Sequence, residues 1–151
     1  MRSDLPPGPG PFRQSYDSRL EAFEGLVEAL TLWAKAAGVS SGHLRDVILI
    51  LDELFSNIVI HGYRHDPQGH ILVEATVETN QVHVTLTDHA PLFNPLLVPA
   101  PDTTLPLEDR PIGGLGLLFV RKTADALDYW TTAPEIQGPV NRLRFTKNLD
   151  A

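Results

Sequence analysis

The stretch "LDELFSNIVIHGY" (residues 51–63) combines a buried helix face with two polar side chains beside it. Apolar residues recur from position 44 onward at the spacing of one helix face, and Gly62 is expected to end the helix. The members of this apolar face are Leu44, Val47, Ile48, Leu51, Leu54, Phe55 and Ile58. Glu53 and Asn57 lie four residues apart next to it, so their side chains project side by side.

Three interpretations of this polar pair are open from the residues alone. An amide oxygen beside a carboxylate suits a hard cation such as Mg²⁺, which prefers oxygen ligands. The carboxylate of Glu53 could instead take a proton from a nucleophile. The pair could also be solvated side chains at the edge of the apolar face.

Composition narrows the class of protein. The chain has 151 residues, enough for one compact domain with a sizeable core. A net charge of −7 and a pI of about 5.2 disfavour a protein that tracks nucleic-acid phosphates. The absence of cysteine excludes disulfides and thiolate metal sites. No apolar run is long enough to span a membrane, and residues 1–13 lack the apolar segment of a signal peptide, so we expect a cytoplasmic protein.

Local patterns predict a single domain over residues 15–151 after a flexible lead-in at 1–14, which is rich in Pro and Gly. A first helix is expected within 15–38, with Ser18 and Glu21 as a capping box and Gly38 at its end. The second helix is expected to start after "SSG" (40–42). Alternating residues predict a hairpin of strands at 70–79 and 81–88, and a closing hairpin from 127–132 and 140–149. The expected fold is α+β: a two-layer sandwich with helices on one face of a mostly antiparallel, mixed sheet.

Two further features carry chemistry. Asp88 has the parity of Val82, Val84 and Leu86, so it is aimed toward the buried side at the end of its strand. It could cap neighbouring backbone, or accept a hydrogen bond from a planar ligand with an exocyclic amino group. Gly113, Gly114 and Gly116 precede a helix, and they are either loop punctuation or a phosphate cradle at the helix N-terminus.

Several familiar motifs do not fit. A Walker A loop needs Gly directly before Lys-Thr, but Lys122-Thr123 follows Arg121. A dinucleotide fingerprint needs a third Gly where Phe119 stands. The His-Arg-Asp signature of eukaryotic-type kinases is absent. His61 and His65 are separated by Gly62, so we expect turn histidines and no zinc site.

Together, three segments resemble the motifs of the GHKL (Bergerat-fold) ATPase and kinase superfamily. Glu53-x-x-x-Asn57 with "IHGY" (60–63) resembles the N box, "DHAPLFNP" (88–95) the G1 box and "GGLGLLFVRK" (113–122) the G2 box. Within that superfamily the chain is most similar to bacterial anti-sigma-factor serine/threonine kinases of the RsbW and SpoIIAB type, including "NRL" at 141–143. The resemblance covers residues 16–149, although Ala90 and Leu92 replace G1 glycines of many relatives.

The resemblance implies a site for ATP or ADP with Mg²⁺. Asn57 would ligate Mg²⁺, Glu53 would be the general base, and Asp88 would bind the adenine amino group. Residues 91–112 would form a lid over the nucleotide, and Arg110 could reach the γ-phosphate. The remaining expected nucleotide contacts are Ala90, Phe93, Gly113, Gly114, Leu115, Gly116 and Leu117.

The resemblance also implies the activity and the partners. The leading hypothesis is a serine/threonine protein kinase that phosphorylates a STAS-type anti-anti-sigma protein and also binds a sigma factor. One alternative is a non-catalytic protein that sequesters a partner in a nucleotide-dependent manner. Another is an ATPase module of a different signalling system. A homodimer is expected by family resemblance, and neither direct nucleic-acid binding nor a membrane partner is expected.

Overall fold

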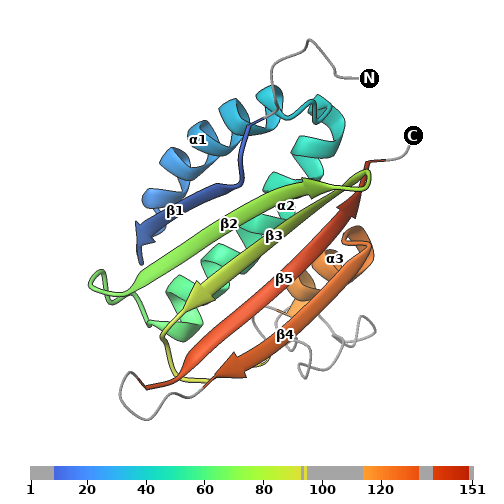
Figure 1. Ribbon diagram of the computed structural model, residues 1–151. Coiled ribbons are helices and arrows are strands. Elements are labelled where there is room, and N and C mark those ends of the chain that lie inside the picture. The colour runs from blue at the N-terminus through green and yellow to red at the C-terminus, as the bar shows by residue number, and fades with distance from the viewer. Residues whose placement is uncertain (1–8, 93, 95–113, 133–137, 150–151) are drawn as a thin grey trace, which may run out of the picture.

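The computed structural model describes residues 9–92, 94, 114–132 and 138–149. Within these ranges, five strands form one sheet in the order β1-β2-β3-β5-β4, and all neighbouring strands are antiparallel. The strands are β1 (Phe12–Asp17), β2 (His70–Glu78), β3 (Gln81–Asp88), β4 (Ala126–Thr132) and β5 (Val140–Asn148). The helices α1 (Ala22–Ala36), α2 (Ser41–Asn57) and α3 (Gly114–Thr123) all lie on one face of this sheet (Figure 1). The predicted α+β two-layer sandwich is therefore confirmed.

The core lies between the helices and the sheet. Helical spacing directs one face of α2 inward, and the alternation of β2 and β3 directs every second residue toward it. The fully buried members include Ile50, Leu51 and Phe55 from α2, Ile71 and Val73 from β2, Val84 and Leu86 from β3, and Phe145 from β5. α2 therefore packs along the centre of the sheet, and it carries the polar pair of the opening stretch.

The start of the chain differs from the prediction. Residues 12–14, expected in the flexible lead-in, belong to β1, which pairs with β2 from Phe12↔Ala75 to Asp17↔His70. The capping box was also wrong: α1 is preceded by Glu21, whose side chain makes no capping hydrogen bond. Ser18 is only 1% exposed, because it lies in the tight connection from β1 to α1.

The second helix begins and ends with recognisable signals. Ser40 is its N-cap and accepts a hydrogen bond from the backbone N–H of His43 at 3.2 Å, so the helix starts slightly before the predicted position. After Asn57 the chain continues as a π-helical turn, η1 (Ile58–Gly62). Such turns are frequent at functional sites. Gly62 ends the helical segment, as predicted, and a Cβ built there would lie 3.1 Å from Ala90 Cβ.

Among the described helices, none combines the length and the apolar character that a membrane-spanning helix needs.

Candidate functional site

A pocket opens between α2 and the end of the sheet where β3 and β5 meet. It encloses about 480 Å³ when all the open space at its mouth is counted. Its apolar lining comes from Leu54 and Ile58 on the helical side and from Leu86 and Leu143 on the strands. Its polar lining is Asn57, Asp88, Tyr129 and Asn141. An apolar pocket with a few convergent polar groups is typical of a small-molecule site.

Asp88 lies at the inner end of this pocket, as its parity predicted, and is only 5% exposed. Its Oδ1 accepts from the backbone N–H of Ala90 at 2.9 Å, which closes an Asx turn, and from Asn141 Nδ2 at 3.0 Å. Its Oδ2 accepts no hydrogen bond from any described residue. Asp88 therefore caps the local backbone with one oxygen, while its other oxygen has no donor among the described residues, so the two interpretations left open by the sequence are compatible.

Burial governs the charge of this carboxyl group. Desolvation raises the pKa of Asp88 above its ordinary value, while the hydrogen bonds from Asn141 and Ala90 and the nearby His89 oppose that shift. The two donors therefore help to keep a buried carboxylate ionised. An ionised carboxylate accepts hydrogen bonds at both oxygens and donates none.

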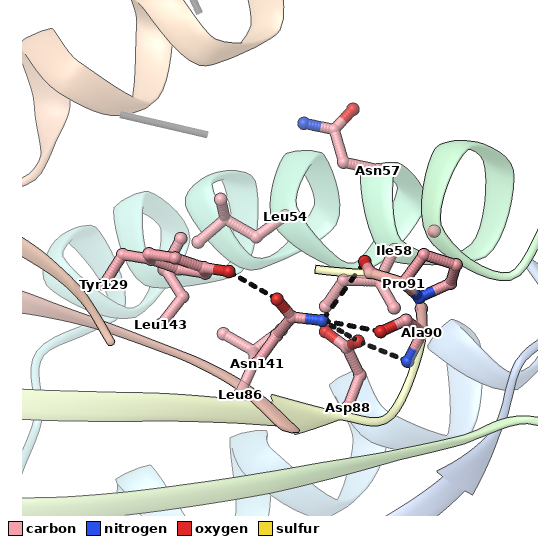
Figure 2. Close-up of a pocket in the computed structure, with 11 residues that line it drawn as sticks. Leu54, Asn57, Ile58, Leu86, Asp88, Ala90, Pro91, Tyr129, Asn141 and Leu143 are labelled. Atoms are coloured by element: carbon pink, nitrogen blue, oxygen red, sulfur yellow. Dashed lines mark hydrogen bonds between the residues drawn. The ribbon is translucent and has the colours of Figure 1, made fainter. Parts of the chain in front are cut away.

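Asn141 and Tyr129 were not assigned to the site from sequence. Asn141 stands directly opposite Asp88 in the pairing of β3 with β5, and its Nδ2 also donates to the carbonyl oxygen of Ala90 at 3.0 Å. The Tyr129 hydroxyl donates to Asn141 Oδ1. Figure 2 shows this chain of hydrogen bonds running along the sheet side of the pocket. Asn141 is 53 residues from Asp88 in sequence, and only the strand register brings them together.

Tyr63 holds the other side of the Asp88–Ala90 turn. Its hydroxyl accepts from the backbone N–H of His89 at 2.7 Å and donates to the carbonyl oxygen of His70 at 2.8 Å. A Cβ built on Gly69 would lie 2.5 Å from the Tyr63 ring, so only glycine fits against it. The tyrosine of "IHGY" thus ties the end of η1 to the start of β2 and the end of β3.

Asn57 lines the same pocket, but its amide is directed away from the Asp88 carboxylate (Figure 2). The amide makes no hydrogen bond with other described residues, so its oxygen is available to a cation. Among the described residues no group of three or more His, Cys, Asp or Glu side chains is placed to hold a metal ion. A cation beside Asn57 would therefore need oxygen ligands from water and from a phosphate chain, which is how Mg²⁺ commonly binds with nucleotides.

Glu53 does not line the pocket, but it contacts the glycine-rich helix. A Cβ built on Gly116 would lie 2.0 Å from Glu53 Oε2 and 2.9 Å from its Cδ. The carboxylate therefore packs against the first turns of α3, where the helix dipole favours negative charge. α2 thus presents Glu53 toward α3 and carries Asn57, one turn later, in the lining of the pocket.

The structure brings together part of the predicted site. Asn57, Asp88 and Ala90 share the pocket, and Glu53 meets Gly116 beside it. Gly114 and Leu115 lie in the first turn of α3, and the Leu117 side chain is buried in the core. The predicted contacts Phe93, Arg110 and Gly113, and the lid at 91–112 except for Pro91, Leu92 and Asn94, lie outside the described residues.

The arrangement of elements matches solved structures at low sequence identity. The RsbU and RsbW domains of a Mycobacterium tuberculosis protein align with a TM-score of 0.64 and 17% identity, covering 93% of this chain and 33% of that one. The SiaB–SiaC complex from Pseudomonas aeruginosa aligns with a TM-score of 0.61 and 16% identity, covering 89% of each chain. At these identities the likeness concerns the fold alone.

Similarity at the level of sequence is more informative. The anti-sigma F factor of Anoxybacillus flavithermus is 35% identical over 103 residues, which cover 61% of this chain and 63% of the relative. The anti-sigma F factor of a Geobacillus species (strain WCH70) is 33% identical over 45 residues, covering 30% and 31%. The chain thus matches less than two thirds of the length of these relatives. The family model of the histidine kinase-like ATPase domain matches residues 16–147, which include every element described above from α1 to the end of β4 and most of β5. The chain therefore belongs to the histidine kinase-like ATPase domain family.

Proposed function

We propose that this protein is an ATP- and Mg²⁺-dependent serine/threonine kinase that acts in the cytoplasm as an anti-sigma factor. Its phosphate acceptor is a STAS-type antagonist, and phosphorylation of that antagonist switches the partner to which the kinase binds. The observation that supports the nucleotide site is the Oδ2 of buried Asp88, which lines an apolar pocket and accepts no hydrogen bond from any described residue. The names of the relatives, anti-sigma F factors, support the regulatory role.

In this proposal the two ends of the site have different tasks. The adenine ring lies between the apolar side chains of α2 and those of β3 and β5, and its amino group donates to Asp88 Oδ2. The phosphates extend toward Asn57 and the N-terminal turn of α3, whose backbone N–H groups favour anions. When bound, Mg²⁺ would neutralise phosphate charge, and Asn57 would be its protein ligand.

Phosphoryl transfer then needs little more than positioning and a base. The hydroxyl oxygen of the acceptor serine or threonine forms a bond to the γ-phosphorus, and the bond from that phosphorus to the β–γ bridging oxygen breaks. The hydroxyl proton passes to the Glu53 carboxylate, and ADP leaves with the bridging oxygen. Glu53 is one helical turn from Asn57, so the base and the metal ligand belong to one rigid element.

The test is transfer of the γ-phosphoryl group from labelled ATP to purified STAS-domain proteins of the same organism. We expect Glu53→Gln to keep nucleotide affinity within about threefold and to lose transfer by at least about 10²-fold, the usual weight of a general base. Asp52→Asn on the neighbouring exposed position is the matched control and should transfer at the wild-type rate. Nucleotide binding without transfer by the wild type would support the sequestering alternative, and hydrolysis independent of any acceptor would support an ATPase module.

A further inference from the structure

We propose that Asn141, supported by a hydrogen bond from Tyr129, is a positioning residue that gives the pocket its selectivity for an amino-bearing base. It does so by occupying one oxygen of Asp88 and leaving the other for the ligand. This inference rests on the proposed nucleotide site and assigns a role to two side chains that the proposed reaction does not use.

Asn141 lies opposite Asp88 in the sheet. Asp88 and Asn141 are directly opposed in the antiparallel pairing of β3 with β5, so their side chains project from the same face toward α2. Both are buried, at 5% exposure each. The Asn141 Nδ2 donates to Asp88 Oδ1 at 3.0 Å, to the Ala90 carbonyl oxygen at 3.0 Å and, more weakly, to that of Pro91 at 3.4 Å. One amide thus holds both the carboxylate and the turn that follows it.

The two ends of the Asn141 amide have different hydrogen-bond partners. A side-chain amide has a donor end and an acceptor end of nearly equal size, so it can face Asp88 in either sense. The hydroxyl of Tyr129 donates to Asn141 Oδ1, so the oxygen lies on the β4 side and the NH₂ group on the Asp88 side. In the reverse sense, the amide oxygen would oppose the carboxylate. The carboxylate of Asp88 and the carbonyl of Ala90 can only accept, so they select this orientation, and the Tyr129 hydroxyl stabilises it by binding the amide oxygen.

The hydrogen bonds to Asp88 determine which of its oxygens a ligand can bind. The Ala90 N–H and Asn141 Nδ2 both bind Oδ1, and the carboxylate plane is thereby fixed with Oδ2 left without a donor among the described residues. A fixed acceptor favours a base with an exocyclic amino group at that point. A base with a carbonyl oxygen there would place two acceptors against each other. ADP and IDP differ in this substituent on the purine ring, amino in one and carbonyl in the other, which makes them a matched pair of probes.

The test measures Kd for ADP and for IDP, both with Mg²⁺, by calorimetry on the full chain. We expect the wild type to prefer ADP by at least about 10-fold, because the site is built around one amino group. Asn141→Ala should weaken ADP by between about 10- and 100-fold, the range for a hydrogen bond to a charged group. It should change IDP by less than about threefold, so that the preference for ADP largely disappears.

Two further variants keep the test independent of folding defects. Tyr129→Phe retains the ring and should reduce the ADP preference in the same direction, by about three- to 10-fold. Asn148→Ala removes an exposed asparagine at the other end of β5 and should leave both affinities within about twofold. Circular dichroism of each variant checks that the fold is kept.

The outcomes separate the two proposals. If the wild type binds ADP but Tyr129→Phe and Asn141→Ala weaken ADP and IDP by the same factor, the role of Asn141 is only structural and this inference is overturned. If the wild type binds neither nucleotide at millimolar concentration, the proposed nucleotide site itself fails, and this inference fails with it.

Discussion

At the scale of single residues, the proposed site depends on a carboxyl group, that of Asp88, whose burial lowers the stability of the folded protein when the group is ionised. In the proposed site, Asp88 accepts a hydrogen bond from the ligand most strongly when it is ionised, yet desolvation raises its pKa in the folded protein. A group with a raised folded pKa contributes its full stability below its unfolded pKa, and that contribution is lost as pH rises through the folded pKa. The buried charge of Asp88 therefore lowers the stability of the protein near neutral pH.

The Asp88→Asn variant tests whether the ionised Asp88 carboxylate lowers stability while it serves ligand binding. The amide oxygen can still accept from Ala90 and Asn141, and no buried charge remains. We expect the Tm of the variant minus the Tm of the wild type to be more positive at pH 7 than at pH 4. Thermal melts at both pH values measure this difference. ADP affinity should fall by more than about 10-fold, since an NH₂ group replaces the free acceptor. A Tm difference that shifts in the opposite direction would contradict the assignment.

Gly116 provides a second test, because it is the point where Glu53 meets α3. In a helix, Gly→Ala usually stabilises by up to about 1 kcal/mol. Here the added Cβ would lie 2.0 Å from Glu53 Oε2, so the glutamate must move and part of that gain is lost. We expect Gly116→Ala to stabilise more in a Glu53→Ala background than in the wild type, as measured by urea unfolding.

The control for this cycle is Gly25→Ala in α1, where an added Cβ meets nothing within 4 Å. It should stabilise the protein by the same amount, up to about 1 kcal/mol, in both backgrounds. Equal effects of Gly116→Ala with and without Glu53 would show that the two residues are not in contact.

At the scale of elements, the β2–β3 hairpin contains a local strain that the fold tolerates. Glu78 pairs with Gln81, so the turn consists of Thr79 and Asn80, with φ values of 49° and 64°. Positive φ at both central residues is the geometry of a type I′ turn, for which Asn and Gly are preferred. A β-branched threonine in this region is a genuine outlier.

Replacing Thr79 with asparagine should therefore relieve strain. We expect Thr79→Asn to raise the free energy of unfolding by about 0.5–1 kcal/mol, since the left-handed conformation costs an ordinary residue about 1–2 kcal/mol. Urea denaturation measures this change, and nucleotide affinity should stay at the wild-type value because the turn lies at the opposite end of β3 from Asp88. A loss of stability would mean that Thr79 makes a compensating contact.

Elements defined by local periodicity could be predicted, and those defined by pairing partners could not. The repeats in 44–58 and 70–88 revealed α2, β2 and β3, and the parity of Asp88 was correct. β1 was missed because "FRQSYD" has no clear alternation of its own. Its Phe12 becomes buried only by pairing with β2 and packing near Trp33.

At the scale of the whole molecule, the same limit applies to the candidate site. The polar pair on α2 and the carboxylate of Asp88 were accessible from sequence, since each is unusual within its own element. Asn141 and Tyr129 are ordinary strand residues by pattern, and only the sheet order β3-β5-β4 places them beside Asp88. A site assembled across a sheet can thus be predicted from sequence only where a residue type is unusual for its position in its own element.

In the proposed site, the fold holds a nucleotide with Asp88 at one end and Mg²⁺ on Asn57 at the other. The most direct measurement is calorimetric titration of ADP and ATP into wild type and Asn57→Ala, with and without Mg²⁺. We predict that Mg²⁺ strengthens nucleotide binding by the wild type, and that the Asn57→Ala variant binds more weakly and no longer responds to Mg²⁺. Binding that is unaffected by both Mg²⁺ and Asn57, or no binding at millimolar nucleotide, would contradict it.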